Sequence, residues 1–170
     1  MNKKTMLLVH AAVIAALYVV LTLLANSLGL ANYAIQVRFS EALTILPFFT
    51  PAAIPGLFVG GVLSNILTGC LPLDVLFGSI ATLLGALGTW VLCGQGNAAK
   101  QTSPVKIFLA PLPPIVANTV IVPFVLAYVY QFEGSIPYFM LTVGAGEVIS
   151  CGILRILLLK VLQKYRKQIF

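Results

Sequence analysis

The chain has 170 residues, of which 60% are hydrophobic and only 8% are charged, and its mean hydropathy is +1.06. So few polar side chains cannot coat a water-soluble domain of this size, and lipid is therefore the expected solvent. The length allows a single transmembrane domain over 1–170, with about six spans of roughly 20 residues each and no soluble domain beside them. The net charge of +6 is not accompanied by a basic patch interleaved with aromatic residues, which argues against nucleic-acid binding.

Hydrophobic stretches separated by glycine- and proline-containing breaks predict six helices. In chain order they cover about 5–26, 35–50, 52–70, 73–94, 106–130 and 138–163. The region 39–70 is ambiguous, because Pro47, Pro51 and Pro55 mark either a hairpin between two spans or kinks in a single helix.

The basic residues favour two spans in this region. Six spans with a cytoplasmic N-terminus place on the cytoplasmic side the residues Lys3, Lys4, Lys100, Lys106, Lys160, Lys164, Arg166 and Lys167. That arrangement leaves only Arg38 opposite, whereas five spans divide the basic residues between the two sides, against the positive-inside rule. We therefore predict an all-α integral membrane protein, a six-helix bundle with both termini in the cytoplasm.

Glu147 lies in an apolar run that is otherwise typical of a membrane-spanning helix. An unpaired charge there costs from roughly 2.5 to over 10 kcal/mol, so such a residue usually faces the protein interior and has a function. The predicted topology places Glu147 roughly 14 Å below the outer face. Asn65 and Asn118 fall in the same outer half, where each either serves a site or joins two helices by a hydrogen bond. Arg38 and Glu41, near the outer face, either serve that site or pair with each other.

Small residues in the first predicted helix form two overlapping small-xxx-small patterns. Their members are Ala11, Ala12, Ala15 and Ala16. Such patterns let another helix approach closely, and the approaching helix belongs either to this chain or to a separate subunit.

Several functional signatures are absent from the sequence. It has no phosphate-binding loop, no acidic metal-binding cluster and no set of residues spaced for nucleophilic catalysis. We therefore expect neither an enzyme nor a cofactor, and any ATP hydrolysis has to come from another subunit.

The sequence also contains extended blocks that carry a resemblance. They are RFSEALT (38–44), LPFFTPAAIPGL (46–57), PLDVLFGSIAT (72–82), APLPP (110–114) followed by Asn118, and GAGEVISC (144–151). In these blocks the chain resembles the QueT family of queuosine-precursor transporters, which are substrate-binding S components of energy-coupling factor (ECF) transporters. The blocks are spread over most of the chain, and the long proline-punctuated block is the most specific.

The resemblance implies a multi-pass protein of the bacterial plasma membrane that captures a 7-deazaguanine, such as queuine, preQ1 or preQ0, outside the cell. It also implies a transmembrane coupling subunit, the T component, that docks on Ala11, Ala12, Ala15 and Ala16. Two ATPase subunits below the coupling subunit would supply the ATP hydrolysis that this chain lacks.

A guanine-type ligand makes the expectation for the acidic residues more specific. Its edge presents a ring N–H beside an exocyclic amine, and these two donors match the two oxygens of a carboxylate. Glu147 is the first candidate to bind this edge, and Glu41 is the second. Polar groups for the acceptor atoms of the base and aromatic rings for its face are expected from Arg38, Asn65, Asn118, Phe39 and Tyr138.

A second class of function remains open on the residues alone. A stand-alone secondary carrier could use Glu147 as a proton or cation site, because intramembrane carboxylates also serve in that role.

Overall fold

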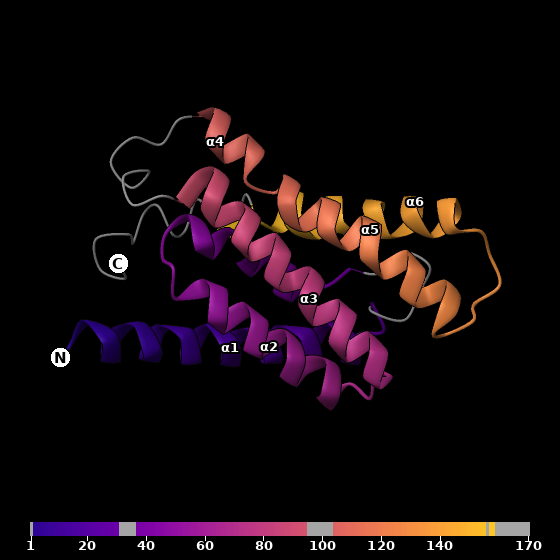
Figure 1. Cartoon of the computed structure of the whole chain (residues 1–170), viewed down its shortest axis with the longest axis horizontal. Helices are drawn as coiled ribbons and strands as arrows, with labels where there is room; N and C mark the ends of the chain where they lie inside the picture. The colour runs from indigo at the N-terminus through magenta and orange to yellow at the C-terminus, as the bar shows by residue number, and fades with distance from the viewer. Residues whose placement is uncertain (1, 31–36, 95–103, 156, 159–170) are drawn as a thin grey trace.

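The computed structural model describes residues 2–30, 37–94, 104–155 and 157–158, and every regular element in these ranges is helical (Figure 1). This confirms the predicted all-α class. The helices with α-helical geometry are α1 (Lys3–Ser27), α2 (Ala53–Leu67), α3 (Pro72–Thr89), α4 (Pro104–Leu109), α5 (Leu112–Tyr128) and α6 (Ile136–Glu147). A 3₁₀ helix, η1 (Phe39–Phe48), precedes α2, and short π-helical turns η2 (Trp90–Gly94) and η3 (Val148–Leu154) extend α3 and α6.

The helix predicted over 106–130 is divided in the structure. Helix α4 ends at Leu109, and α5 begins at Leu112. Pro113 and Pro114 lack an N–H group and suit a first helical turn, where no donor is needed, so the chain starts a new helix there. The helices predicted over 35–50 and 138–163 are described only from 37 onward and up to 158.

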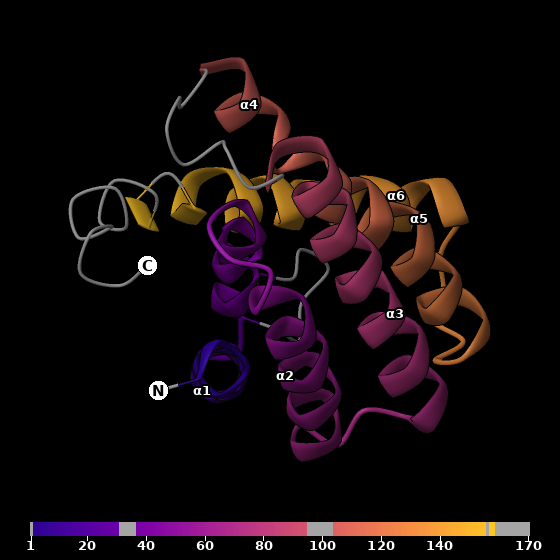
Figure 2. The ribbon, with the colours of Figure 1, turned by 60° about the vertical axis from the view of Figure 1, so that its left-hand side comes forward.

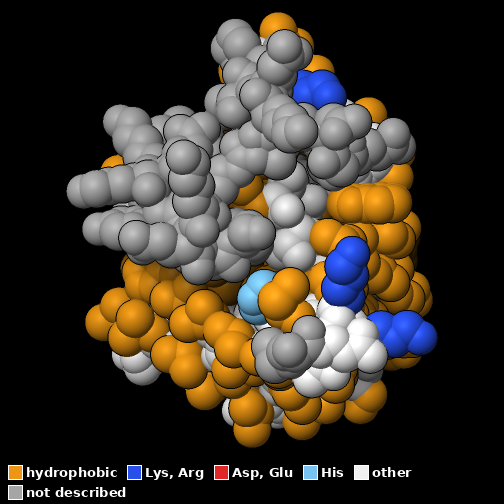
Figure 3. Space-filling model, turned by 90° about the vertical axis from the view of Figure 1, so that its left-hand side faces the viewer, with side chains coloured by type: hydrophobic (Ala, Val, Ile, Leu, Met, Phe, Trp, Pro, Cys, Tyr) orange, Lys and Arg blue, Asp and Glu red, His pale blue; other side chains and the backbone are white. Residues whose placement is uncertain are grey.

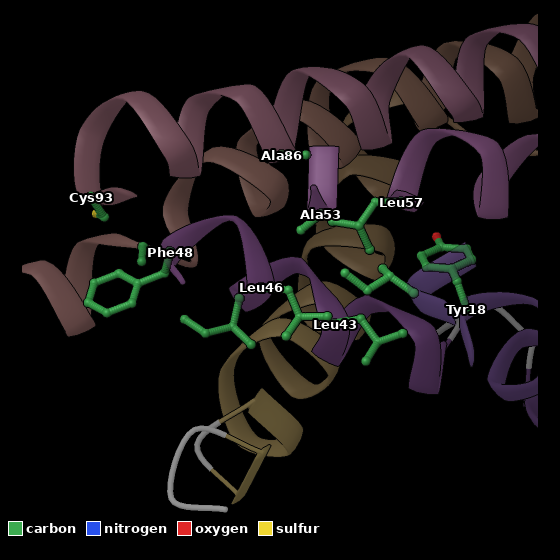
Figure 4. Packing of buried hydrophobic residues seen from close by; sticks show 11 residues of the cluster. Tyr18, Leu43, Leu46, Phe48, Ala53, Leu57, Ala86 and Cys93 are labelled. Atoms are coloured by element: carbon green, nitrogen blue, oxygen red, sulfur yellow. The ribbon is translucent and has the colours of Figure 1, made fainter. Parts of the chain in front are cut away.

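Helix η1 lies in the centre of the bundle. Nine consecutive residues, from Ser40 to Phe48, are buried, and η1 contacts α1, α2, α3, η2 and η3. Figure 2 shows this segment in purple between α1 and α6. The apolar side chains of η1 contribute to the core, where Leu43, Leu46 and Phe48 pack with Leu57 of α2 and Ala86 of α3 (Figure 4).

The geometry of η1 determines how far its side chains lie from one another. A 3₁₀ helix rises about 2.0 Å per residue and has three residues per turn, so side chains three apart point in the same direction. Arg38, the residue before η1, therefore lies one turn and about 6 Å along the axis from Glu41.

Helices α1 and α2 pack at backbone contact through two glycines. A Cβ atom on Gly56 would lie 2.7 Å from the carbonyl oxygen of Ala11, and one on Gly60 would lie 2.8 Å from Cβ of Tyr18 and 3.1 Å from Cα of Ala15. Neither position has room for a side chain. One face of the small-residue pattern of α1, with Ala11 and Ala15, therefore packs against α2 within the chain.

Three of the described helical stretches are long and apolar enough to cross a membrane. They are Lys3–Ser27, Pro72–Cys93 and Ile136–Leu154. The other three apolar helices, Phe39–Phe48, Ala53–Leu67 and Leu112–Tyr128, are shorter. At about 1.5 Å per residue, the 17 residues of α5 span roughly 25 Å, which is a little less than a hydrocarbon core of about 30 Å.

Charged side chains are distributed unevenly between the two ends of the bundle. The end where α1 begins and α4 lies exposes Lys3, Lys4 and Lys106. Figure 3 shows this end with basic and hydrophobic side chains and, among the described residues, no visible acidic one. Asp74 and Glu133 lie at the opposite end, beside the start of α3 and between α5 and α6.

The α1–α2 contact provides a test of the packing. We expect Gly60→Ala to lower the free energy of unfolding by roughly 1–3 kcal/mol relative to Gly61→Ala, because only the first creates a clash with α1. A Cβ on Gly61 would meet Thr82 at an ordinary 3.6 Å, and both changes gain the same helix propensity. The measurement is the unfolding midpoint of each variant in detergent micelles titrated with dodecyl sulfate. Equal midpoints would contradict the close α1–α2 contact.

Candidate functional site

A cavity of about 680 Å³ opens at the acidic end of the bundle, between the ends of α1, α2 and α5 and the starts of α3 and α6. This volume is within the range of small-molecule sites. Its polar lining consists of Thr22, Asn26, Arg38, Asn65, Thr68, Cys70, Asp74, Tyr130, Glu133, Tyr138 and Thr142. Few of these groups bond to one another, so the cavity offers hydrogen-bonding capacity to a ligand.

Asp74 and Asn65 meet on one wall of the cavity above Gly78. A Cβ atom at Gly78 would lie 3.1 Å from the amide nitrogen of Asn65 and 3.4 Å from Oδ1 of Asp74, so the glycine makes room for both groups. Oδ2 of Asp74 accepts a hydrogen bond of 2.8 Å from the hydroxyl of Tyr130. Burial, together with this bond, raises the pKa of Tyr130, so the hydroxyl retains the proton that it donates.

A second polar group lies on η1, α6 and η3 and contains Glu41, Glu147 and Cys151, which we call the buried acid cluster. One ligating atom from each residue lies within 4.8 Å of the others. Oε1 of Glu147 accepts from the amide of Asn118 at 3.0 Å, and Oε2 accepts from the thiol of Cys151 at 3.2 Å. Both oxygens of Glu147 therefore have protein donors.

Glu41 differs from Glu147 in this respect. Its Oε1 accepts a hydrogen bond of 2.6 Å from Tyr18, but its buried Oε2 has no hydrogen-bond partner among the described residues. Glu41 is only 2% exposed. A buried acceptor without a donor is costly and rare, and it marks a position where an additional donor would be favourable.

The buried acid cluster is connected to the cavity through neighbouring residues. Arg38 lines the cavity, and its backbone N–H donates to Oγ of Ser150, one residue before Cys151. Thr22 also lines the cavity, and its hydroxyl donates to Ser40, one residue before Glu41. The charge of Arg38 acts on Glu41, on Glu147 and on Asp74. Arg38 is therefore the electrostatic link between the two groups.

The residues that could hold a metal are those of the buried acid cluster, because two carboxylates and a sulfur form a plausible ligand set. In this structure, however, the Cys151 thiol donates to Glu147 and lies 3.6 Å from the hydroxyl of Thr44. A cysteine that binds a metal does so as a thiolate, so the thiol would have to lose the proton that it donates to Glu147. Without an ion, the three groups form a hydrogen-bonded polar network.

The predicted site residues fall into three groups. Arg38, Asn65 and Tyr138 line the cavity, and Asn118 belongs with Glu41 and Glu147 to the hydrogen-bonded network below it. Phe39 is half-buried and lines neither of them. The aromatic side chains that do line the cavity are Tyr130, Phe132, Tyr138 and Phe139.

Sequence reasoning missed Asp74 and Tyr130 as site residues. Asp74 follows Pro72 at the start of α3, where a carboxylate is an ordinary feature of a first helical turn. Tyr130 lies just after the end of α5 and carries no signal of its own. Only the approach of α5 to α3 brings the two side chains together.

The four alanines of α1 divide between two faces. Ala15 is 7% exposed and packs against Gly60 of α2, whereas Ala12 and Ala16 are exposed. Ala11 is half-buried, and its backbone oxygen contacts α2 at Gly56. Of the two small-residue patterns, the one formed by Ala11 and Ala15 is used inside the chain, and the one formed by Ala12 and Ala16 faces outward.

Comparison with known proteins gives one match. The model of a family described as QueT transporter matches residues 8–164, nearly the whole chain. No curated protein and no solved structure matches the chain. The helical bundle, with its apolar surface and its polar cavity, is consistent with a transporter, and the matched family is a transporter family and not an enzyme family. The chain belongs to the QueT transporter family.

Proposed function

We propose that this protein is the substrate-binding S component of an ECF transporter and captures a 7-deazaguanine outside the cell for ATP-driven import. The observation that carries the proposal is the buried Oε2 of Glu41, which has no donor among the described residues. Glu41 lies one turn of η1 from Arg38, and Arg38 lines the cavity of about 680 Å³. A transporter of queuosine precursors has to recognise a guanine-like edge, and such an edge presents two neighbouring N–H donors.

The buried acid cluster supplies the acceptors for that edge. Glu41 has one oxygen free of protein donors, and each oxygen of Glu147 retains a second lone pair beside its existing bond. Hydrogen bonds from a base to an ionised carboxylate are roughly twice as strong as neutral ones. We therefore assign Glu41 as the primary acceptor and Glu147 as its neighbour, which reverses the order expected from the sequence.

The remaining polar groups have complementary roles in this proposal. Asn65 donates and accepts in the cavity wall, and Arg38, between cavity and cluster, offers donors to the carbonyl oxygen of the base. The rings of Tyr138 and Phe132 line the same cavity and suit the face of a flat heterocycle.

The membrane orientation follows from the uneven charge. The end of the bundle with Lys3, Lys4 and Lys106 faces the cytoplasm under the positive-inside rule, and the cavity then opens outward. In this arrangement all six apolar helices span the bilayer of the bacterial plasma membrane, with both termini inside. The three shorter helices fit a locally thinner bilayer or the interior of the assembly.

Partners are part of the proposal because the chain has no nucleotide-binding motif. The exposed face of α1 carries Ala12 and Ala16, flanked one turn away by Leu8 and Val20, which are 71% and 60% exposed. We assign this flat apolar face to the transmembrane coupling subunit, which connects the protein to two ATPases. Ala11 and Ala15, on the other side of α1, pack on α2 and so fix the position of this exposed face.

The stand-alone carrier remains a second candidate, because one observation favours it. Two carboxylates and a thiol have ligating atoms within 4.8 Å in a buried position, and such a group can hold a proton or a cation. In that case Glu147 and Glu41 would bind the coupling ion rather than the base.

Substitution of the acids tests the ligand site. We expect Glu41→Gln to weaken binding of 7-aminomethyl-7-deazaguanine at least tenfold, about 1.4 kcal/mol, because an amide NH₂ would face the donors of the base. Glu147→Gln should cause a similar loss. Calorimetry on the purified protein measures both, with Lys106→Gln at the opposite end of the bundle as a control that should not change the affinity. Unchanged affinity in both acid variants would contradict binding of the base by Glu41 and Glu147 and would indicate that the buried acid cluster has a structural role.

The docking face has its own test. Ala16→Leu should prevent co-purification with the coupling subunit and leave ligand affinity unchanged, because the added side chain projects from an exposed face. Ala145→Leu makes the same change on the exposed face of α6 and should leave co-purification intact. If both variants retain the coupling subunit, the docking surface is elsewhere.

Reconstitution distinguishes the two candidate functions. We expect vesicles to accumulate the labelled base only when they contain this chain, the coupling subunit, both ATPases and ATP, since the sequence contains no nucleotide-binding motif. Uptake by this chain alone, driven by an imposed proton or cation gradient, would establish the carrier instead.

A further inference from the structure

Asp74 is a buried carboxylate that the recognition of the base edge does not use. It lines the cavity and is 8% exposed, and among the described residues the hydroxyl of Tyr130 donates a hydrogen bond to it. A buried carboxylate is unfavourable unless a positive charge or several donors compensate for it. Arg38 supplies part of that compensation, but it also acts on Glu41 and Glu147.

Asp74 and the buried acid cluster lie at different depths in the bundle. Asp74 is the third residue of α3, at the end of the bundle where α6 begins (Figure 1). Glu147 is the last of the 12 residues of α6, so it lies roughly 16 Å along the helix axis from the first residue of α6. A ligand whose base edge reaches the buried acid cluster therefore presents its opposite side, which carries the 7-substituent, toward Asp74.

The charges around the cavity favour a cation at that position. Among the described residues that line the cavity, the acidic and basic side chains are Arg38, Asp74 and Glu133. Two further carboxyl groups, those of Glu41 and Glu147, belong to the buried acid cluster. The tyrosine and phenylalanine rings that line the same cavity are suited to cation–π contacts with such a cation.

We propose that Asp74, oriented by Tyr130, is the counter-ion for a protonated amine on the 7-substituent of the ligand, so that the protein selects amine-bearing 7-deazaguanines over neutral ones. This inference rests on the proposed function and names the substrate class of that site. An alkyl amine is protonated at neutral pH, as lysine is, whereas a nitrile carries no charge. A nitrile would leave the Asp74 carboxylate in the cavity without its counter-ion.

Tyr130 is a positioning residue in this account. Its hydroxyl donates to Oδ2 of Asp74 and accepts from the backbone N–H of Leu71 at 3.3 Å. The two bonds hold the hydroxyl between the α2–α3 connection and the cavity. Oδ1 of Asp74, above Gly78, then stays available to the ligand.

The test compares three probes on the purified full-length protein by calorimetry: 7-deazaguanine, its 7-cyano derivative and its 7-aminomethyl derivative. We expect the wild type to bind the aminomethyl base at least tenfold more tightly than the cyano base. Asp74→Asn should remove most of that ratio and change the affinity for the cyano base by less than about threefold, a retained affinity that also shows an intact fold. Tyr130→Phe should reduce the ratio by a smaller factor.

Glu133→Gln provides the matched comparison, because it removes the same charge from an exposed position on the cavity rim. Its effect on the ratio should be far smaller than that of Asp74→Asn.

Equal wild-type affinities for the cyano and aminomethyl bases, or an unchanged ratio in Asp74→Asn, would overturn the inference and leave the proposed function intact. If Asp74→Asn binds neither base, an unchanged ratio in Tyr130→Phe overturns the inference, and a reduced ratio supports it. Failure of the wild type to bind any of the three probes would overturn both proposals.

Discussion

The hydrogen bond from Tyr18 to Glu41 connects the packing of this bundle to its polar site. A carboxylate that is 2% exposed in an apolar interior needs a donor fixed in place, and the 2.6 Å contact supplies it. Tyr18 is itself positioned by Gly60, which lets α2 contact the backbone of α1. A side chain at Gly60 would therefore change the site as well as the helix contact.

The 3₁₀ geometry of η1 has a second consequence for the site. Because the helix has three residues per turn, Arg38 and Glu41 lie one above the other, with Arg38 in the cavity wall and Glu41 in the buried acid cluster. Long 3₁₀ runs are uncommon, since their hydrogen bonds are less well aligned than those of an α-helix. Burial on every side, from Ser40 to Phe48, provides the packing that holds this one in place.

The polar groups are arranged in two layers with different chemistry. The inner layer has carboxylate oxygens hydrogen-bonded to Asn118, Cys151 and Tyr18, and its geometry is fixed by those bonds. In the outer layer, the carboxylate of Asp74 accepts a hydrogen bond from Tyr130 and lies in the cavity wall. A fixed inner layer suits a constant part of a ligand, such as a base, and the outer layer suits the part that varies between related compounds.

The sequence by itself determined the helical class, the membrane environment and the transporter family, and it predicted site roles for Glu147, Glu41, Arg38, Asn65 and Asn118. Composition and local blocks are sufficient for these conclusions, because an isolated polar residue in an apolar run is visible without any tertiary contact. The tertiary structure alone decided which carboxylate retains an unbonded oxygen, which alanines of α1 face outward, and that Asp74 and Tyr130 share the cavity. These features depend on contacts between helices far apart in the chain, and the rotation and approach of one helix against another are not encoded in the local pattern of either.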